Sequence, residues 1–500
     1  MPPLSVRRRA FIRCSALAAA YLNIPRIGFA QSAPYRRVEW QKFKTMPQYA
    51  SFINAVKKMK ANTSAASPSS WAYWTNVHVN YCLHGTSYFL AWHRGYLYYF
   101  EQRLRLVSGD NTLCLPYWDY YKYPKIPIEF TDPSATNPLY VPRVNTSVFQ
   151  ALTLSPFASK VKNFQRGTVN AFEPQLETAP HNPVHDLIGG EMANMTSPRD
   201  PIFYLHHANI DRLWQAWALS GGKSMPVTSN PYNAAVSASY WANSFTYASD
   251  LTLPRYKTYD PAWLNVSYAD LTLPTYLPPS ARATPDSPIR RVQTQSLAVL
   301  TRPPVGNFAT TSARPISATR RALGGVSGMV LTDVPVSGHL RLSASSLQSL
   351  QDALSVAVGP SARTSPQSFR SVVVVMDQIQ VLSGGKNGGY FYHIYLNLPY
   401  VTDAIGAQKY FLGTVGPFEI AAASHHGAAT LEYQATEVLS RLSVFELQEV
   451  TISLLQVGGD NAPRGAVVKI GEVRIDISTV APWDSGPSTQ EKYSDYGLTD

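Results

Sequence analysis

Residues 181–214 hold the stretch that decides the fold: His181-Asn182-Pro183-Val184-His185, then Asp200-Pro201-Ile202-Phe203-Tyr204-Leu205-His206-His207-Ala208-Asn209-Ile210-Asp211-Arg212-Leu213-Trp214. On a helix, His181 and His185 face the same side because they are four residues apart. Pro183 fits such a helix only in its first turn. The second segment predicts a helix on which His207, Asp211 and Trp214 share one stripe. One histidine alone would be a hydrogen-bonded core residue, but the paired spacing indicates a metal site.

A second histidine cluster lies upstream. The aromatic spacing from Ser70 onward predicts a helix that carries His78 and ends before Gly85. His84 and His93 are half a turn out of phase, so one continuous helix could not direct both imidazoles at one ion. The break after Gly85 lets His84 come from a loop, with His93 in a new helix over residues 88–107. His78, His84 and His93 are therefore the first candidate triplet, and His181, His185 and His207 are the second.

All-imidazole ligand sets without carboxylate or thiolate suit copper, and also zinc or iron. A zinc hydrolase with three histidine ligands needs only one such set. Two matched sets inside one helical unit instead predict a pair of metal ions that hold one small ligand between them.

Composition narrows the class of protein. A chain of 500 residues with 45% hydrophobic residues is expected to fold into two or three soluble domains. No apolar run is long enough to predict a membrane span. The net charge is +11, but residues 1–30 contribute five arginines and no acids, which leaves +6 for the rest. We therefore expect a mildly basic surface and no nucleic-acid partner.

The first 30 residues predict an export signal. Basic residues 7–13 precede the small apolar run Ser15–Leu22, and small residues follow near Ala30. Arg8-Arg9-Ala10-Phe11-Ile12-Arg13 resembles a bacterial twin-arginine signal, and an ordinary Sec signal is the alternative. The mature chain would be periplasmic or secreted and would keep only Cys82 and Cys114. An oxidising compartment makes a disulfide between them the default expectation.

The composition and the hydrophobic periodicity of the chain change after residue 276. Residues 277–321 are rich in Pro, Ser, Thr, Ala and Arg and predict an extended linker. Period-two patterns follow in residues 322–500: a hairpin of 372–382 and 390–398 turning at Asn387-Gly388, and strands at 448–457 and 466–477. These residues are expected to form a separate β-rich domain, a sandwich or a barrel. Its histidines are interpreted as ordinary exposed or packed residues: His339, His393, His425 and His426.

The histidine motifs carry a family resemblance. Cys82-Leu-His84-Gly-Thr-Ser-Tyr-Phe-Leu-Ala-Trp-His93-Arg-Gly-Tyr-Leu-Tyr-Tyr-Phe-Glu101 resembles the first copper motif of tyrosinases and polyphenol oxidases, and the 181–214 stretch resembles the second. The resemblance implies two copper ions in a type 3 centre, held in a four-helix bundle within a catalytic domain of residues 31–276. It implies His207 as ligand, with His206 and Asp211 as support. His78 lies closer to His84 than the family's first ligand usually does, but no other histidine precedes it.

The resemblance also implies an activity. The family uses O2 to hydroxylate monophenols in the ortho position and to oxidise o-diphenols to o-quinones. Glu177 and Asn182 match the residues that hold a water beside the second copper, which favours monophenol oxidation; Glu177 as a helix cap is the alternative. Catechol or o-aminophenol oxidation alone, and oxygen carriage as in molluscan haemocyanins, are the competing functions. The sequence does not indicate an oligomeric state.

Three further features bear on the site. Cys82-Leu-His84 matches the pattern that forms a cysteine–histidine thioether in some relatives, against a disulfide or a free thiol. Asn194-Met195-Thr196 carries no aromatic ring where some plant catechol oxidases place one, which implies an open entrance. Asp186 is a candidate for influencing which substrates enter. The C-terminal domain resembles the domain that covers the copper site in latent polyphenol oxidases.

Overall fold

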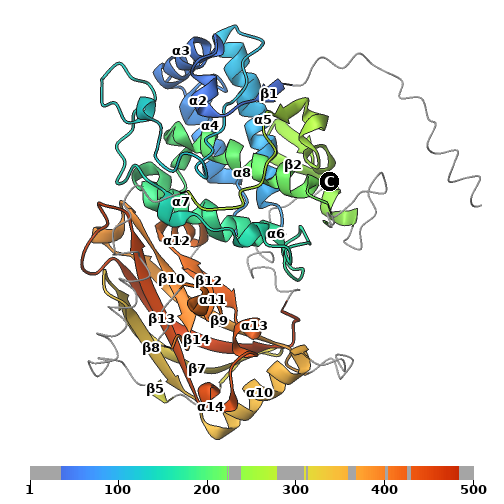
Figure 1. The fold of residues 1–500 in the computed structure, drawn as a ribbon, viewed down its shortest axis with the longest axis vertical. Helices are drawn as coiled ribbons and strands as arrows, with labels where there is room; N and C mark the ends of the chain where they lie inside the picture. The colour runs from blue at the N-terminus through green and yellow to red at the C-terminus, as the bar shows by residue number, and fades with distance from the viewer. Residues whose placement is uncertain are drawn as a thin grey trace, which may run out of the picture.

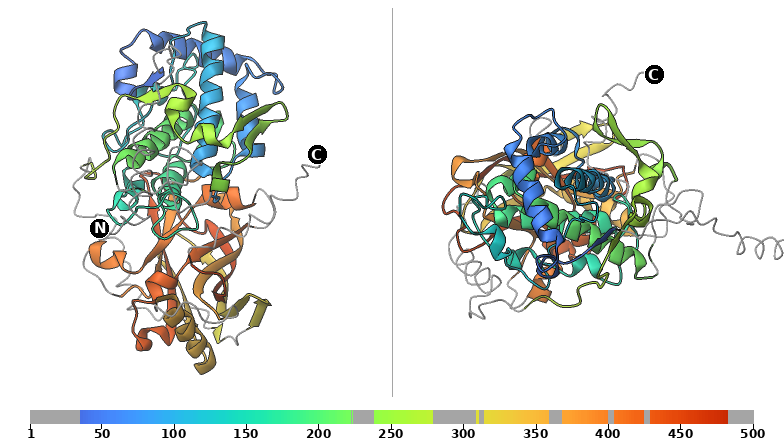
Figure 2. Two further views of the ribbon diagram at one scale, coloured as in Figure 1. Left: turned by 90° about the vertical axis from the view of Figure 1, so that its right-hand side faces the viewer. Right: turned by 90° about the horizontal axis from the view of Figure 1, so that it is seen from above.

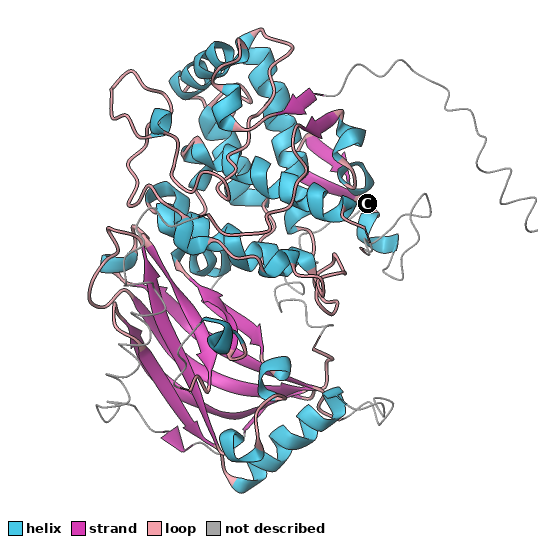
Figure 3. Cartoon of the chain, viewed as in Figure 1, coloured by secondary structure: helices cyan, strands magenta, loops and turns pink. Residues whose placement is uncertain are grey.

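Helices form the first half of the described chain and strands form most of the second. The computed structural model describes residues 35–221, 223, 238–278, 309–310, 314–358, 368–399, 404–424 and 429–482. The helical part, mostly blue to green in Figure 1, lies above a strand-rich part in yellow, orange and red. The same two lobes appear in the side view (Figure 2). The helical core and the strand-rich C-terminal region confirm the predicted fold class (Figure 3).

Four helices of the helical lobe carry histidines of the two predicted triplets. Ser70 caps α4 by accepting a hydrogen bond from the Tyr73 amide, and Gly109 ends α5 with a φ of 76°. Gly85 has a φ of 66° in the loop between α4 and α5, which confirms the predicted break. The helices of this lobe are α2 (Trp40–Phe43), α3 (Gln48–Ala61), α4 (Trp71–Tyr81), α5 (Phe89–Ser108), α6 (Phe172–Leu176), α7 (Asn182–Ile188) and α8 (Ile202–Leu219).

The helical lobe also contains two small two-stranded sheets. β1 (Tyr35–Arg37) pairs in parallel with β4 (Val266–Tyr268), and β2 (Ser244–Ala248) forms a hairpin with β3 (Leu251–Pro254). The rest of residues 110–201 and 238–264 consists of loops and single helical turns, at 128–130, 149–151, 155–157, 177–181, 190–193, 197–199, 238–241, 255–258 and 261–264. The β1–β4 pair brings the two ends of the helical lobe together.

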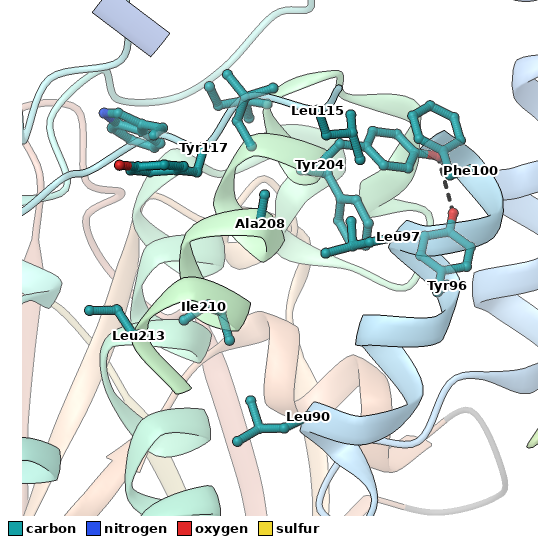
Figure 4. Packing of buried hydrophobic residues seen from close by; sticks show 14 of the residues in the cluster. Leu90, Tyr96, Leu97, Phe100, Leu115, Tyr117, Tyr204, Ala208, Ile210 and Leu213 are labelled. Atoms are coloured by element: carbon teal, nitrogen blue, oxygen red, sulfur yellow. Dashed lines mark hydrogen bonds between the residues drawn. The ribbon is translucent and has the colours of Figure 1, made fainter. Parts of the chain in front are cut away.

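Aromatic packing and a buried charge network fix α5 against α8. The ring of Phe100 stacks on Tyr204 at 3.6 Å between centroids, and the Tyr96 and Tyr204 hydroxyls are hydrogen-bonded at 3.1 Å (Figure 4). Asp211, one turn beyond His207, accepts from Arg94 Nε at 2.6 Å. Its other oxygen contacts the Tyr268 hydroxyl and the Arg37 guanidinium. The predicted support residue therefore joins three parts of the lobe.

The strand-rich lobe is a sandwich of two five-stranded sheets around its own apolar core. Their strand orders are β11-β10-β13-β8-β5 and β12-β9-β14-β7-β6. The strands are β5 (Ala309–Thr310), β6 (Arg314–Ser317), β7 (Arg320–Leu331), β8 (Val336–Arg341), β9 (Ser371–Val381), β10 (Tyr390–Leu396), β11 (Phe411–Val415), β12 (Ala429–Gln434), β13 (Glu449–Gly458) and β14 (Val468–Ser478). Helices join them: α10 (Ala344–Val358), α11 (Ala404–Gln408), α12 (Pro417–Ser424), α13 (Thr436–Leu439) and α14 (Val444–Leu447).

Three sequence-based expectations differ from this structure. The predicted hairpin is wrong, because β9 and β10 lie in different sheets. The connection between them, residues 382–389, is too long for a two-residue turn and crosses from one sheet to the other. The predicted 277–321 linker overlaps β5, β6 and the start of β7, while residues 279–308 and 311–313 lie outside the described residues. Cys82 and Cys114 are both free thiols, so the default disulfide is absent.

Candidate metal centre

Six imidazoles from four helices and two connecting segments meet at the lower end of the helical lobe. His78 comes from α4, His93 from α5, His185 from α7 and His207 from α8, while His84 comes from the predicted loop. His181 lies directly before the first turn of α7, where Pro183 is tolerated. Five of these side chains are at most 3% exposed, and His84 is partly buried. The structure therefore brings all six predicted ligands together.

Backbone carbonyls fix the tautomers of three imidazoles. The Nδ1 atoms of His78, His93 and His185 lie 2.8–2.9 Å from the carbonyl oxygens of Met195, Phe89 and Met192. A carbonyl oxygen only accepts hydrogen bonds, so each Nδ1 carries the proton and each Nε2 keeps its lone pair. His181 Nδ1 is held in the same way at 2.8 Å by Asn182 Oδ1. A hydrogen-bonded Nδ1–H with a free Nε2 is the arrangement of metal-binding histidines.

The imidazoles form two groups that face each other. Ring centroids are 5.1–5.7 Å apart within His78, His84 and His93, and 4.7–5.5 Å apart within the second group. His93 stacks on His207 across the gap at 4.4 Å. The Nε2 atoms of His185 and His207 are 3.3 Å apart.

The electrostatics of these groups favour cation binding. Burial, reinforced by the neighbouring imidazoles, lowers the pKa of His84, His181 and His207 well below its ordinary value. The rings are therefore neutral near pH 7, as metal ligands must be. Among the described residues, the Nε2 atoms of His84, His93 and His181 are buried without a hydrogen-bond partner. Buried nitrogen lone pairs that converge in this way fit a pair of copper ions.

By distance alone, the side chains of His206 and Cys82 could also be metal ligands. Ligand atoms of His181, His185, His206 and His207 lie within 4.8 Å of one another, as do those of His78, Cys82 and His84. The His206 ring packs on Tyr120 and His181, whereas the His207 ring stacks on His93 of the first group. Cys82 Sγ lies 3.3 Å from His84 Nδ1, the ring nitrogen opposite to the ligand atom Nε2. Both residues therefore lie behind the proposed ligands.

Glu177 bridges the two halves of the site. One carboxylate oxygen accepts from the Gly85 amide at 2.6 Å, next to His84, and the other pairs with Arg166. Burial raises the pKa of Glu177, and the Arg166 guanidinium opposes this shift. Asn182 is buried and contacts His181. Arg166 was not predicted from the sequence, because it lies in a loop without any motif.

A phenylalanine from the other lobe covers the site. Phe418, in the first turn of α12, is fully buried and stacks on His185 with centroids 3.9 Å apart and an interplanar angle of 15°. It also lies 5.1 Å from the His84 ring and 5.6 Å from the His181 ring. The open entrance expected from Asn194-Met195-Thr196 is therefore wrong for this structure. The ring comes from a segment more than two hundred residues downstream.

Asp186 anchors the covering segment. Its Oδ1 accepts a hydrogen bond from the Phe418 amide at 2.7 Å, and its own carbonyl accepts from the Gly389 amide at 2.7 Å. Burial raises the pKa of the Asp186 carboxyl well above its ordinary value. α7 and α12 consequently lie against each other where the lobes meet (Figure 1).

Further hydrogen bonds between the lobes join backbone groups to other backbone groups or to amide and hydroxyl side chains. Gly190 N donates to Asn387 O at 2.8 Å, and Asn145 Nδ2 donates to the carbonyls of Leu187 and Gly389. A Cβ on Gly388 would lie 2.8 Å from Ala193 Cβ and 3.0 Å from the Asp186 carbonyl oxygen. The two lobes therefore meet closely around the segment that was predicted to be a hairpin turn.

The other histidines have local partners or lie outside the described residues. His339 pairs with Glu449 at 3.0 Å, and burial lowers the pKa of His393 to about 4. His425 and His426 fall outside the described residues, as does the predicted export signal. None of the helices in the described ranges is both long and apolar enough to cross a membrane.

Comparison with known proteins agrees with this geometry. The family model "common central domain of tyrosinase" matches residues 56–159 and 134–220. Tyrosinase HcTyr1 of Hahella sp. (strain CCB-MM4) is 37% identical over 185 residues, 30% of this chain and 40% of that protein. Polyphenol oxidase B of Solanum lycopersicum is 28% identical over 244 residues, 36% of this chain and 41% of that protein. The matches therefore span about two fifths of these relatives.

Two further similarities bear on function and fold. Hemocyanin 1 of Megathura crenulata is 33% identical over 157 residues, 27% of this chain and 4% of that protein. The solved structure of latent apple tyrosinase aligns with a TM-score of 0.50 at 18% identity, covering 89% of this chain and 96% of that one. At this identity the structural match shows a shared fold, which includes both lobes.

Proposed function

Because the chain belongs to the tyrosinase and polyphenol oxidase family, we propose that it is a copper-dependent phenol oxidase. It hydroxylates monophenols in the ortho position and oxidises o-diphenols to o-quinones with O2. The observation that carries this proposal is the pair of facing imidazole groups, in which four of the six rings have their Nδ1 proton held by an acceptor outside the group. The ligands would be His78, His84 and His93 for one ion, and His181, His185 and His207 for the other. The bound copper pair supplies the O2-dependent oxidation.

The protein side chains position the phenol and remove its proton. A free phenol has a pKa of about 10, so hydroxylation near neutral pH needs a base close to the substrate hydroxyl. We assign this task to a water held by Glu177 and Asn182. The raised pKa of the buried Glu177 brings this carboxylate closer to the range of a useful base. Asn182 has a second task, since its Oδ1 keeps His181 in the tautomer that leaves Nε2 available.

The C-terminal domain keeps the enzyme closed in this proposal. The stacked Phe418 ring occupies the face of His185 that an aromatic substrate would need, and it excludes water from the site. The chain would then comprise an export signal (1–30), a catalytic domain (31–276), a linker that ends before β5 (277–308) and a covering domain that begins with β5 (309–500). Cleavage in the linker would permit the covering domain to leave. Export to the periplasm or beyond would deliver the enzyme to its substrates.

The contact between Cys82 and His84 supports a thioether. At 3.3 Å the thiol is against the His84 ring, and no disulfide competes for it in the described chain. Its formation would remove one hydrogen atom from the Cys82 thiol and one from a His84 ring carbon, with O2 as the two-electron oxidant, and the bond would fix the orientation of this ring. We expect a purified protein without residues 1–30 that is lighter by two hydrogen atoms and in which iodoacetamide labels only Cys114. Labelling of both cysteines in the denatured, unreduced protein would contradict the thioether.

Oxygen carriage is the second candidate, favoured by the match to Hemocyanin 1. The deciding experiment measures copper content and quinone formation from a monophenol, an o-diphenol and o-aminophenol, before and after proteolysis in the linker. We expect two copper ions per chain and oxidation of both phenol classes, which increases after cleavage. Quinone from the o-diphenol or o-aminophenol alone would restrict the function to catechol or aminophenol oxidation. Reversible O2 binding without any quinone would indicate a carrier.

A further inference from the structure

Arg166 connects three parts of the site, although it lies in a loop before α6. Its guanidinium pairs with the Glu177 carboxylate, and its Nε donates to the Thr86 carbonyl at 3.3 Å. Its own backbone amide donates to Glu173 Oε2 at 3.3 Å. Thr86 lies two residues after the proposed ligand His84. One arginine therefore joins the carboxylate that is assigned to hold the water to the loop that supplies a ligand.

The pair of Arg166 and Glu177 is largely withdrawn from water. The Arg166 side chain is 18% exposed and the Glu177 side chain is 4% exposed, so solvent and salt screen this pair much less than a surface ion pair. The other Glu177 oxygen accepts from the Gly85 amide at 2.6 Å. The carboxylate is thus held from two sides in one orientation. A guanidinium in this place also favours the ionised form of the acid.

We propose, building on the phenol oxidase function, that Arg166 is a positioning residue for the hydroxylation of monophenols. It keeps the Glu177 carboxylate ionised and in the orientation in which Glu177 and Asn182 hold the water that takes the phenol proton. Oxidation of an o-diphenol inserts no oxygen, and the proposed function does not assign it to this water. Loss of Arg166 should therefore reduce monophenol oxidation more than o-diphenol oxidation.

Two further acids and one thiol face this pair. Glu173 accepts from the Arg166 amide, and burial raises the pKa of Glu173 well above its ordinary value. Glu419 approaches the pair from α12 of the covering domain, and burial raises the pKa of Glu419 to about 8. Burial also raises the pKa of the Cys82 thiol, which faces Glu177. These shifts favour the neutral forms of the three groups, so Glu177 is the acid whose charge the guanidinium balances.

The test compares p-cresol with 4-methylcatechol, which differ only in the second hydroxyl group. Both substrates meet the same open form of the copper-loaded full chain, so the ratio of their kcat/KM values is independent of how often the chain opens. We expect Arg166→Gln to lower the ratio of p-cresol to 4-methylcatechol about tenfold or more, and Arg166→Lys to restore part of it because lysine keeps the charge. The control Arg441→Gln removes an exposed arginine–glutamate pair and should keep the native ratio. A native ratio in Arg166→Gln would overturn the proposal, because a purely structural role changes both rates alike.

The pH dependence of the same ratio reports the ionisation of Glu177. Burial raises the pKa of Glu177 and the Arg166 guanidinium opposes this shift, so removing the guanidinium should raise the pKa further. The monophenol rate needs the ionised carboxylate and therefore falls on the acid side of this pKa. We expect the acid limb of the ratio to move to higher pH in Arg166→Gln and to return toward its native place in Arg166→Lys. An acid limb that stays in place in Arg166→Gln would overturn the proposal.

A double-mutant cycle separates this inference from the oxidase function. The full chain is compared with Arg166→Gln, Glu177→Gln and the double variant by denaturant titration. Each substitution removes the same buried pair, so we expect a coupling of about tenfold or more in the unfolding equilibrium constant. Additive effects would overturn the link between Arg166 and Glu177. Coupling together with no quinone from either substrate would instead reject the oxidase function on which the proposal rests.

Discussion

Replacing Phe418 with alanine should activate the full chain. Phe418 is fully buried against His84, His181 and His185 in the closed arrangement, whereas it would face water when the covering domain is open. Removing a buried phenylalanine side chain costs about 3–5 kcal/mol. Because the ring is buried only in the closed arrangement, the substitution destabilises that arrangement and leaves the free energy of the open one nearly unchanged. At about 3 kcal/mol and about 1.4 kcal/mol for each factor of ten, the open fraction should rise about a hundredfold.

The assay is the initial rate of quinone formation from an o-diphenol by the copper-replete, uncleaved chain. Phe445→Ala is the matched control, since Phe445 belongs to the same domain but is 84% exposed on α14. We expect strong activation by Phe418→Ala and none by Phe445→Ala. Linker cleavage should then add less to the Phe418→Ala rate than to the native rate. If Phe418→Ala with full copper content is no faster than the native chain, the covering role assigned to this ring is refuted.

Four other changes test separate parts of the structure. Asn182→Ala should lower copper affinity about 10- to 100-fold, because His181 loses its Nδ1 acceptor, and it should reduce monophenol rates more than diphenol rates; equal loss of both rates at unchanged copper content would exclude the water-holding role. Burial raises the pKa of Glu419 to about 8 from its ordinary 4.5 in the closed arrangement. The closed arrangement therefore binds this proton more tightly than the open one, and the free energy that favours closure should fall as pH rises through this range. The activity of the uncleaved chain should rise over the same range, and less steeply in Glu419→Gln. Asp211→Asn should reduce the free energy of unfolding by about 3–5 kcal/mol, against about 0.5 kcal/mol or less for the exposed Glu437→Gln, as measured by denaturant titration. Gly388→Ala should raise the activity of the uncleaved chain because its Cβ would collide with Ala193, and an unchanged rate would show that the interface can adapt.

The clustering of the six histidines was predictable because its geometry is mostly local. The four-residue spacing of His181 and His185 directs both imidazoles to the same side of the chain. The break at Gly85 explains why His84 and His93 can lie in one cluster although they are half a turn out of phase. Helix periodicity also located Asp211 one turn after His207. These relations depend on short stretches of backbone, which the sequence determines directly.

The groups that complete the site were not predictable, since they depend on tertiary packing. The carbonyls of Met192 and Met195 fix His185 and His78, yet every residue has a carbonyl and no side chain marks these two. Arg166 reaches Glu177 from a loop, where spacing carries no information. Phe418 lies in a segment without histidine, periodicity or repeat that would connect it to α7.

The segment Gly384–Gly389 shows how one local signal can have two explanations. Asn387-Gly388 between two apolar strands is typical of a hairpin turn, and Gly388 and Gly389 do have φ values of 70° and 90°. The hairpin, however, would need β9 and β10 to be neighbours, and each instead pairs with other strands in its own sheet. The glycines permit a close approach of the backbone to α7, where Gly389 N donates to the Asp186 carbonyl. The residue that holds Phe418 by its carboxylate thus also holds this loop by its backbone, so opening at either contact should loosen the other.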